Sequence, residues 1–190
     1  FFSLLLLIFN FSLNATLPWG LPIGSGAIQI DALSSFFLCV IFLLSATASW
    51  YSLDYYRNHK EQHLRAHYFF FAVFIASMSL AVVAANALLF LLSWEMMTIS
   101  SLFLVGEDHA DPKNRRASRV YFGASQIGVA AILTCFILLA QSSGDLNFAN
   151  MSASGSQAVL VFALALVGFG CKAGIVPLHI WLPEAHPAAP

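Results

Sequence analysis

The sequence predicts an all-α fold, a polytopic bundle of about six transmembrane helices in which the last helix is broken. Hydrophobic residues make up 59% of the 190 residues and charged residues only 9%, whereas typical soluble domains carry about 25% charged residues. The apolar residues also gather in runs of about 20, the length that an α-helix needs to cross the hydrocarbon core of a bilayer. A lipid bilayer is therefore the expected surrounding, and a soluble enzyme is excluded.

The expected spans follow these apolar runs in order along the chain. The run at 68–106 holds one charged residue, Glu95. At about 1.5 Å per residue it would be roughly 57 Å long, enough for two crossings. We place the turn between these crossings at Asn86, because asparagine favours turns. The expected spans are 1–17, 31–51, 68–85, 86–106, 119–140 and 157–176.

Both ends of the sequence indicate a fragment. The chain begins with Phe1 inside an apolar run, and it stops at Pro190 in a segment typical of a loop or a helix start. We therefore expect residues 1–190 to form a single transmembrane domain that is truncated at both ends.

Lys and Arg residues give the expected orientation in the membrane. Seven of the eight fall in two segments, one before the third expected span and one before the fifth. If 68–106 folds back as a hairpin, both segments lie on one side of the membrane, and the positive-inside rule makes that side cytoplasmic. The net charge of −1 without a long basic run excludes nucleic-acid binding. The seven residues are Arg57, Lys60, Arg65, Lys113, Arg115, Arg116 and Arg119.

The cysteine and histidine residues give little indication of a metal site. The three cysteines, Cys39, Cys135 and Cys171, lie far apart in apolar runs, and the sequence contains no C-x-x-C motif. Zinc and iron–sulfur sites need such clusters, so we expect no metal and no cofactor in this chain. The histidines of the first basic segment, among them His67, are expected to be solvated.

Glu95 is the first candidate functional residue. Of its helical neighbours at three and four residues, only Thr98 is polar, so the carboxylate must find a partner on another helix, a water molecule or a proton. Ionisable groups inside membranes usually mark proton or ion paths. The alternatives are a carboxylate that only joins helices, or a glutamate that stays protonated.

Lys172 is the second candidate, because it is the one cation outside the two basic segments. Gly170 and Gly174 form a G-x-x-x-G pair that allows close helix approach. Pro177 removes a backbone donor and clashes one turn back, which predicts a broken helix. The alternative is a lysine that extends its side chain to the cytoplasmic interface.

His179 and His186 follow the expected break. A single histidine in such a position is more often structural. Two histidines beside an intramembrane lysine favour a proton relay, because histidine changes its charge near neutral pH. We therefore count both as candidate proton-relay residues.

Segments 93–97 and 172–190, which contain Glu95 and Lys172, resemble the antiporter-like membrane subunits of respiratory complex I and of group 4 membrane-bound [NiFe] hydrogenases. The end at 186–190 and the triplet at 114–116 favour the branch that holds hydrogenase-4 component B and formate hydrogenlyase subunit 3. The resemblance covers essentially the whole chain. It implies the N-terminal part of a longer subunit built from two inverted repeats.

The resemblance also implies a function. In the family the motif glutamate and lysine, here Glu95 and Lys172, form a buried pair, with the lysine at a helix break. The chain would be a proton-translocating, non-catalytic subunit of a redox-driven complex in a bacterial or archaeal cytoplasmic membrane. Its partners would be other membrane subunits and peripheral redox subunits with iron–sulfur or nickel–iron centres. The alternatives are a multisubunit cation/proton antiporter subunit and a non-conducting structural anchor.

Overall fold

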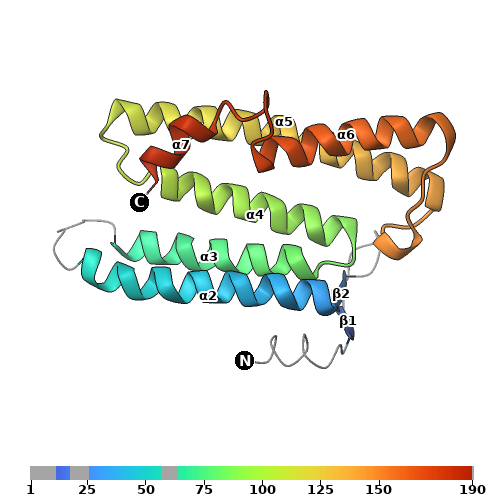
Figure 1. Cartoon of the computed structure of the whole chain (residues 1–190), viewed down its shortest axis with the longest axis horizontal. Coiled ribbons are helices and arrows are strands. Elements are labelled where there is room, and N and C mark those ends of the chain that lie inside the picture. Colours follow the sequence, from blue (N-terminus) through green and yellow to red (C-terminus); the bar gives the residue numbers. More distant parts are fainter. Residues whose placement is uncertain (1–11, 18–25, 57–63, 190) are drawn as a thin grey trace. The chain divides into compact units, whose positions relative to one another are not determined.

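The computed structural model describes residues 12–17, 26–56 and 64–189. Five of its helices are long and apolar enough to cross a membrane, which confirms the polytopic helical fold (Figure 1). They are α2 (Ala32–Tyr55), α3 (Leu64–Val83), α4 (Ala87–Val105), α5 (Pro112–Ser143) and α6 (Gly155–Ala173). The remaining elements are β1 (Leu13–Leu17), β2 (Gly26–Ile30), the 3₁₀ helix η1 (Phe148–Asn150) and α7 (Leu182–Ala188).

The first expected span, 1–17, lies mostly outside the described residues. Its described end is not helical, because β1 pairs with β2 as an antiparallel hairpin in which Leu13 lies opposite Ile30. The backbone of this hairpin also binds the link between α3 and α4, since Ala85 N donates to Ala27 O at 3.0 Å. The β-hairpin therefore satisfies backbone groups that a helix ending at Leu17 would have satisfied internally.

The chain divides into two compact units, Phe1–Met97 and Thr98–Pro190, which we describe in turn. In the first unit, α2 and α3 run antiparallel with the β-hairpin at one end (Figure 1). Ser34 at the start of α2 donates to Val82 O at the end of α3 at 3.2 Å. At the other end of the pair, the hydroxyl of Tyr56 lies 3.1 Å from His67 Nδ1.

His67 differs from expectation. It belongs to α3, which begins at Leu64, before the expected start of the span, and its side chain is buried at 9% exposure. Its ring stacks on Phe71 one turn later. A histidine side chain can be buried when its ring nitrogen has a hydrogen-bond partner, here the hydroxyl of Tyr56. The prediction that His67 is a solvated loop residue is therefore wrong.

The apolar run at 68–106 is divided between α3 and α4 at the residues where the sequence analysis placed the turn. Asn86 stands just before α4, and its side-chain oxygen accepts a hydrogen bond from Leu88 N at 2.8 Å. An asparagine in this place satisfies backbone donors that the first turn of a helix leaves without partners. The same residue type that favours the turn therefore also starts the next helix.

In the second unit, α5 and α6 lie side by side, and α7 packs on the beginning of α5 (Figure 1). Helix α5 starts seven residues earlier than the expected span at 119, at Pro112. The carboxylate of Asp111 caps it by accepting from Lys113 N at 2.8 Å. An acidic residue followed by proline is a strong signal for a helix start, and hydrophobicity alone does not show it.

Candidate functional site

The helix that carries Lys172 ends in its next turn. Gly174 adopts a left-handed conformation with φ of 72°, and its N–H bonds back to Gly170 O. A side chain would be strained at this φ, and a Cβ at Gly174 would also stand 2.5 Å from Leu182 Cδ1. The end of α6 at Ala173 is therefore set by Gly174.

Pro177 lies outside the helix, three residues after Gly174. The expected clash of its ring inside a helix therefore does not occur. Gly170 faces the returning chain, because a Cβ there would meet Leu178 Cδ1 at 3.2 Å. In the described chain, Gly170 and Gly174 thus make room for the segment at 175–182, whereas the sequence analysis assigned them to contact with another helix.

A tryptophan side chain forms a hydrogen bond with one backbone carbonyl in the last turn of α6. Trp181 Nε1 donates to Cys171 O at 2.7 Å. Carbonyls in the last turn of a helix have no partner within the helix, so this bond ties the segment after the break back to the end of α6. Trp181 also places its ring against Tyr121 of α5 in an edge contact, with ring centroids 5.2 Å apart.

The ammonium group of Lys172 meets two hydroxyl groups. Its Nζ donates to Tyr121 OH at 2.8 Å and to Thr98 Oγ1 at 3.2 Å, and it lies 5.2 Å from the centre of the Tyr121 ring. Thr98 has no exposed surface and Tyr121 is 4% exposed. Hydrogen bonds to a charged group are strong in such water-poor surroundings. The site therefore holds the lysine head in one place.

A small apolar core supports Tyr121. Val105, Ala117 and Ala185 are buried with it, and they bring together the end of α4, the beginning of α5 and α7. Trp181 packs against the same cluster. Because a phenol ring held on several sides has little freedom to rotate, the position of its hydroxyl is set by the core of this unit.

Two glycines bring α6 close enough to α5 for Lys172 to reach this hydroxyl. A Cβ at Gly168 would stand 2.3 Å from Ile132 Cγ1 and 3.0 Å from Gly128 O. A Cβ at Gly128 would stand 3.0 Å from Cys171 Cβ. Small residues at such crossings allow the backbones of membrane helices to approach. The sequence analysis missed both glycines because they are far apart in the chain.

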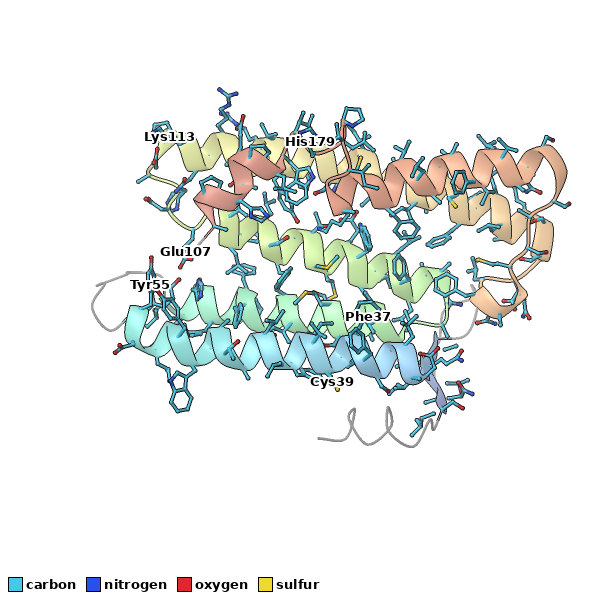
Figure 2. All side chains as sticks on the ribbon, in the orientation of Figure 1. Phe37, Cys39, Tyr55, Glu107, Lys113 and His179 are labelled. Atoms are coloured by element: carbon cyan, nitrogen blue, oxygen red, sulfur yellow. The ribbon has the colours of Figure 1, made fainter. Side chains whose placement is uncertain are left out.

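The two candidate histidines lie in different surroundings after the break. His179 is in the turn between α6 and α7 (Figure 2). Among the described residues, its buried Nδ1 has no hydrogen-bond partner. His186 is exposed on α7. In the described parts of the chain, no three His, Cys, Asp or Glu side chains gather in a way that could hold a metal ion.

Glu95 lies in α4 and is half-buried. It belongs to the first unit and Lys172 to the second, so their pairing stays a prediction. The continuous helix α4 does place Glu95 three residues before Thr98, which is about one helical turn.

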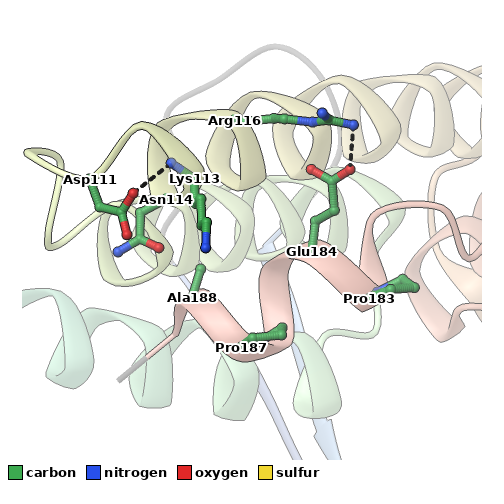
Figure 3. A pocket seen from close by; sticks show the side chains of 8 residues that line it. All are labelled: Asp111, Lys113, Asn114, Arg116, Pro183, Glu184, Pro187 and Ala188. Carbon is green, nitrogen blue, oxygen red and sulfur yellow. Dashed lines mark hydrogen bonds and ion pairs between the residues drawn. The ribbon is translucent and has the colours of Figure 1, made fainter.

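An open pocket lies on the second unit beside this site. Its volume is about 510 Å³, and the first turns of α5 and helix α7 line it (Figure 3). Arg116 and Glu184 face each other there, with Arg116 Nη2 3.0 Å from Glu184 Oε1. Arg116 is exposed, so this ion pair contributes little to stability, but it joins the two helices that meet beside Tyr121.

Comparison with known proteins gives a consistent result. Residues 84–190 match the family described as "NADH:quinone oxidoreductase/Mrp antiporter, TM". Hydrogenase-4 component B of Escherichia coli K12 is 43% identical over 166 residues, which cover 86% of this chain and 25% of that protein. NADH-quinone oxidoreductase subunit L of the same organism is 33% identical over 171 residues, which cover 82% of this chain and 26% of that protein.

The fold also matches that of a solved structure. The Mrp complex of Dietzia sp. DQ12-45-1b contains a chain that superposes with a TM-score of 0.79, at 19% identity. The match covers 98% of this chain and 36% of that one. The present chain thus spans about a quarter of the length of the curated relatives that it matches.

Proposed function

Because the chain belongs to the NADH:quinone oxidoreductase/Mrp antiporter transmembrane family, we propose that it is part of a proton-translocating membrane subunit of a redox-driven complex. The complex would be of the membrane-bound hydrogenase or NADH dehydrogenase type. The chain is a multi-pass membrane protein of the cell membrane, with five apolar helices in its described parts. It supplies no catalytic residue and no redox centre of its own in this proposal.

One observation carries the proposal. Lys172, an ionisable residue in an apolar helix, lies in the last turn of α6, and buried hydroxyls from α4 and α5 hold its ammonium group. A lysine that merely extended to the membrane surface would direct its ammonium group to water. Intramembrane lysines held by protein groups are typical of ion and proton paths.

In the proposed path, Lys172 takes up and releases a proton, and Glu95 modulates the proton affinity of Lys172. Glu95 lies one turn before Thr98 on α4, and Thr98 contacts Lys172. His179, whose buried Nδ1 has no hydrogen-bond partner in the described part of the chain, and His186 would connect Lys172 to the next part of the path. Gly170, in the last turn of α6, and Gly174 and Pro177, which follow its end, would keep the helix broken at this point.

The partners follow from the same proposal. The two relatives above are named as a component of hydrogenase-4 and a subunit of an NADH-quinone oxidoreductase. We propose that this chain assembles likewise with other membrane subunits. Peripheral subunits would carry the iron–sulfur or nickel–iron centres. The rest of the subunit, with a second inverted repeat, would supply the other half of the proton path.

A substitution in the full-length protein within its complex tests the function. Lys172→Ala should abolish proton uptake into liposomes, and Glu95→Gln should impair it severely, because an amide cannot change its charge. Reduction of a soluble electron acceptor should persist in both variants. Asp108→Asn, at an exposed carboxylate after α4, serves as the matched control and should pump normally. Normal coupling in both site variants would instead support a structural anchor.

The second candidate function is a subunit of a cation/proton antiporter. It is favoured by the family description, which includes Mrp antiporters, and by the fold match to the Mrp complex. The same liposomes distinguish the two functions. A sodium gradient should drive proton movement in an antiporter without any electron donor, whereas a redox-driven subunit should require the donor.

A further inference from the structure

Lys172 stands at one end of a connected series of hydrogen bonds. Its Nζ donates to Tyr121 OH at 2.8 Å, and Tyr121 OH lies 2.6 Å from Ser101 Oγ. Ser101 Oγ in turn donates to the backbone oxygen of Thr98 at 3.0 Å. All four residues belong to the same compact unit, so the series can be followed from end to end.

The donor in the Tyr121–Ser101 hydrogen bond can be identified by counting the hydroxyl hydrogens that are available. A serine hydroxyl carries one hydrogen, and a carbonyl oxygen can only accept. The Ser101 hydrogen therefore points to the Thr98 carbonyl, and Ser101 Oγ accepts from Tyr121. The single phenol hydrogen of Tyr121 then points away from Lys172. Tyr121 turns only a lone pair toward the amine.

We propose that Tyr121 is a positioning residue that holds Lys172 in its proton-bearing form, and that Ser101 sets the direction of the phenol. The inference rests on the proposed function, in which Lys172 takes up and releases a proton. An oxygen that only accepts stabilises an ammonium group, and it offers no hydrogen to a neutral amine. The proton therefore leaves Lys172 by a route other than Tyr121.

The surroundings of Tyr121 make this hydroxyl hard to replace. The residue is 4% exposed, and its ring is held by Trp181 and by the apolar cluster with Val105 and Ala117. Water has little access to a site of this kind, so loss of the hydroxyl would leave Lys172 with one fewer acceptor. Thr98 Oγ1, at 3.2 Å, is the second acceptor that the site provides.

Other titratable and charged groups lie on the elements that pack around Lys172 in the second unit. They include Cys171 on α6, Arg116 and Arg119 on α5, and His179, Glu184 and His186 after the break. Glu184 is paired with Arg116. A variant that keeps all of these groups and changes only the phenol hydroxyl isolates the contribution of Tyr121.

Tyr121→Phe in the full-length protein within its complex makes that change, because the ring and its contact with Trp181 remain. We expect the midpoint of the pH dependence of proton uptake into liposomes to move down by about one pH unit, the equivalent of one hydrogen bond to a charged group. Ser101→Ala should give a smaller shift in the same direction. Tyr68→Phe is the matched control, since Tyr68 forms a hydroxyl pair with Ser52 at 3.2 Å in the other unit, and its profile should not move.

A second readout does not depend on pumping. A small, membrane-permeant, amine-reactive reagent modifies the neutral amine of lysine and not its ammonium form. Mass spectrometry then gives the modified fraction of Lys172 at each pH. In Tyr121→Phe, modification should begin at lower pH than in the wild type. If labelling shifts while Lys172→Ala pumps normally, the positioning role stands and the proposed function fails. Wild-type labelling curves in both Tyr121→Phe and Ser101→Ala would overturn the inference, as would a loss of pumping rate at every pH without a shift of the midpoint.

Discussion

The two antiparallel helix pairs of this chain are built in different ways. In the first unit, α2 and α3 are joined by polar contacts near their ends, where Ser34 binds Val82 O and Tyr56 meets His67. In the second unit, α5 and α6 approach closely where Gly128 in the middle of α5 meets Gly168 in the second half of α6.

The difference also appears in what each pair buries. Helix α2 buries only Ser35 and Leu38, and it leaves large side chains such as Trp50 exposed at 81%. Helix α5 buries a continuous stripe that includes Tyr121, Gly128 and Ile132. The comparison teaches that close backbone approach is found in the pair that positions Lys172. The pair without a candidate site relies on side chains near the helix ends.

The largest effect in this comparison is expected at the close approach. Gly168→Ala would place a Cβ 2.3 Å from Ile132 Cγ1 and 3.1 Å from Ile132 N, so the helices must separate. Overpacking of this kind typically costs about 1–3 kcal/mol, and the separation would also move Lys172 from Tyr121. Thermal unfolding of the purified protein in detergent should show a clearly lower midpoint.

The matched control lies on the same helix pair. Gly123 is exposed in α5, and a Cβ there would meet nothing within 4 Å. Gly123→Ala should leave the midpoint unchanged or raise it slightly, since alanine favours helices by about 1 kcal/mol over glycine. Equal destabilisation by both substitutions would mean that the close approach does not hold the pair together.

A smaller effect is expected in the first unit. Tyr56→Phe removes the hydroxyl that lies 3.1 Å from His67 Nδ1, and a buried hydrogen bond contributes about 1 kcal/mol. The ring contact with His67, at 4.7 Å between centroids, would remain. Detergent unfolding should therefore show a modest loss of stability, with proton uptake by the full complex unchanged. A loss of proton uptake would show that this end of α2 and α3 takes part in function after all.

The smallest effect concerns the loop between α5 and α6. Hydrogen bonds from the side chains of Asn150 and then Asn147 hold the pKa of Asp145 below its usual value of 3.8. A carboxyl whose pKa is lowered by folding contributes stability that is present above the unfolded value and lost as pH falls through the lowered one. Amide exchange at Leu146 and Asn147, whose N–H groups bind this carboxylate, should lose protection only below pH 3.8. Unchanged protection at lower pH would show that the loop does not depend on the charge.

Hydropathy and residue type predicted much of the fold. They predicted helices at the five described apolar segments and the turn at Asn86. They also singled out Glu95 and Lys172, whose roles stay predictions. They did not predict Tyr121, Thr98 and Ser101 as a group. These hydroxyls come from two helices, and a single sequence does not show which helix faces meet. One signal was available, since a tyrosine or tryptophan inside an apolar segment needs a partner for its polar tip. Tyr121 and Trp181 both meet that description.

Local backbone chemistry explains the other differences. The start of α5 depends on Asp111 and Pro112, and the end of α6 depends on the left-handed conformation of Gly174. The sequence analysis predicted the break from Pro177, whereas Gly174, three residues earlier, ends the helix. The strand at Leu13–Leu17 depends on pairing with Gly26–Ile30, which the apolar character of this segment does not reveal.

The length of α5 has a mechanical consequence. Its 32 residues form an unbroken rod of about 48 Å at 1.5 Å per residue, and both α6 and α7 pack on it. Helices α6 and α7 therefore share one rigid reference across the break. Gly128 and Gly168 hold α6 to that reference beside Lys172, and the packing of Ala185 against Tyr121 holds α7 to it. The segments before and after the break are therefore positioned through α5 and not only through the turn that joins them.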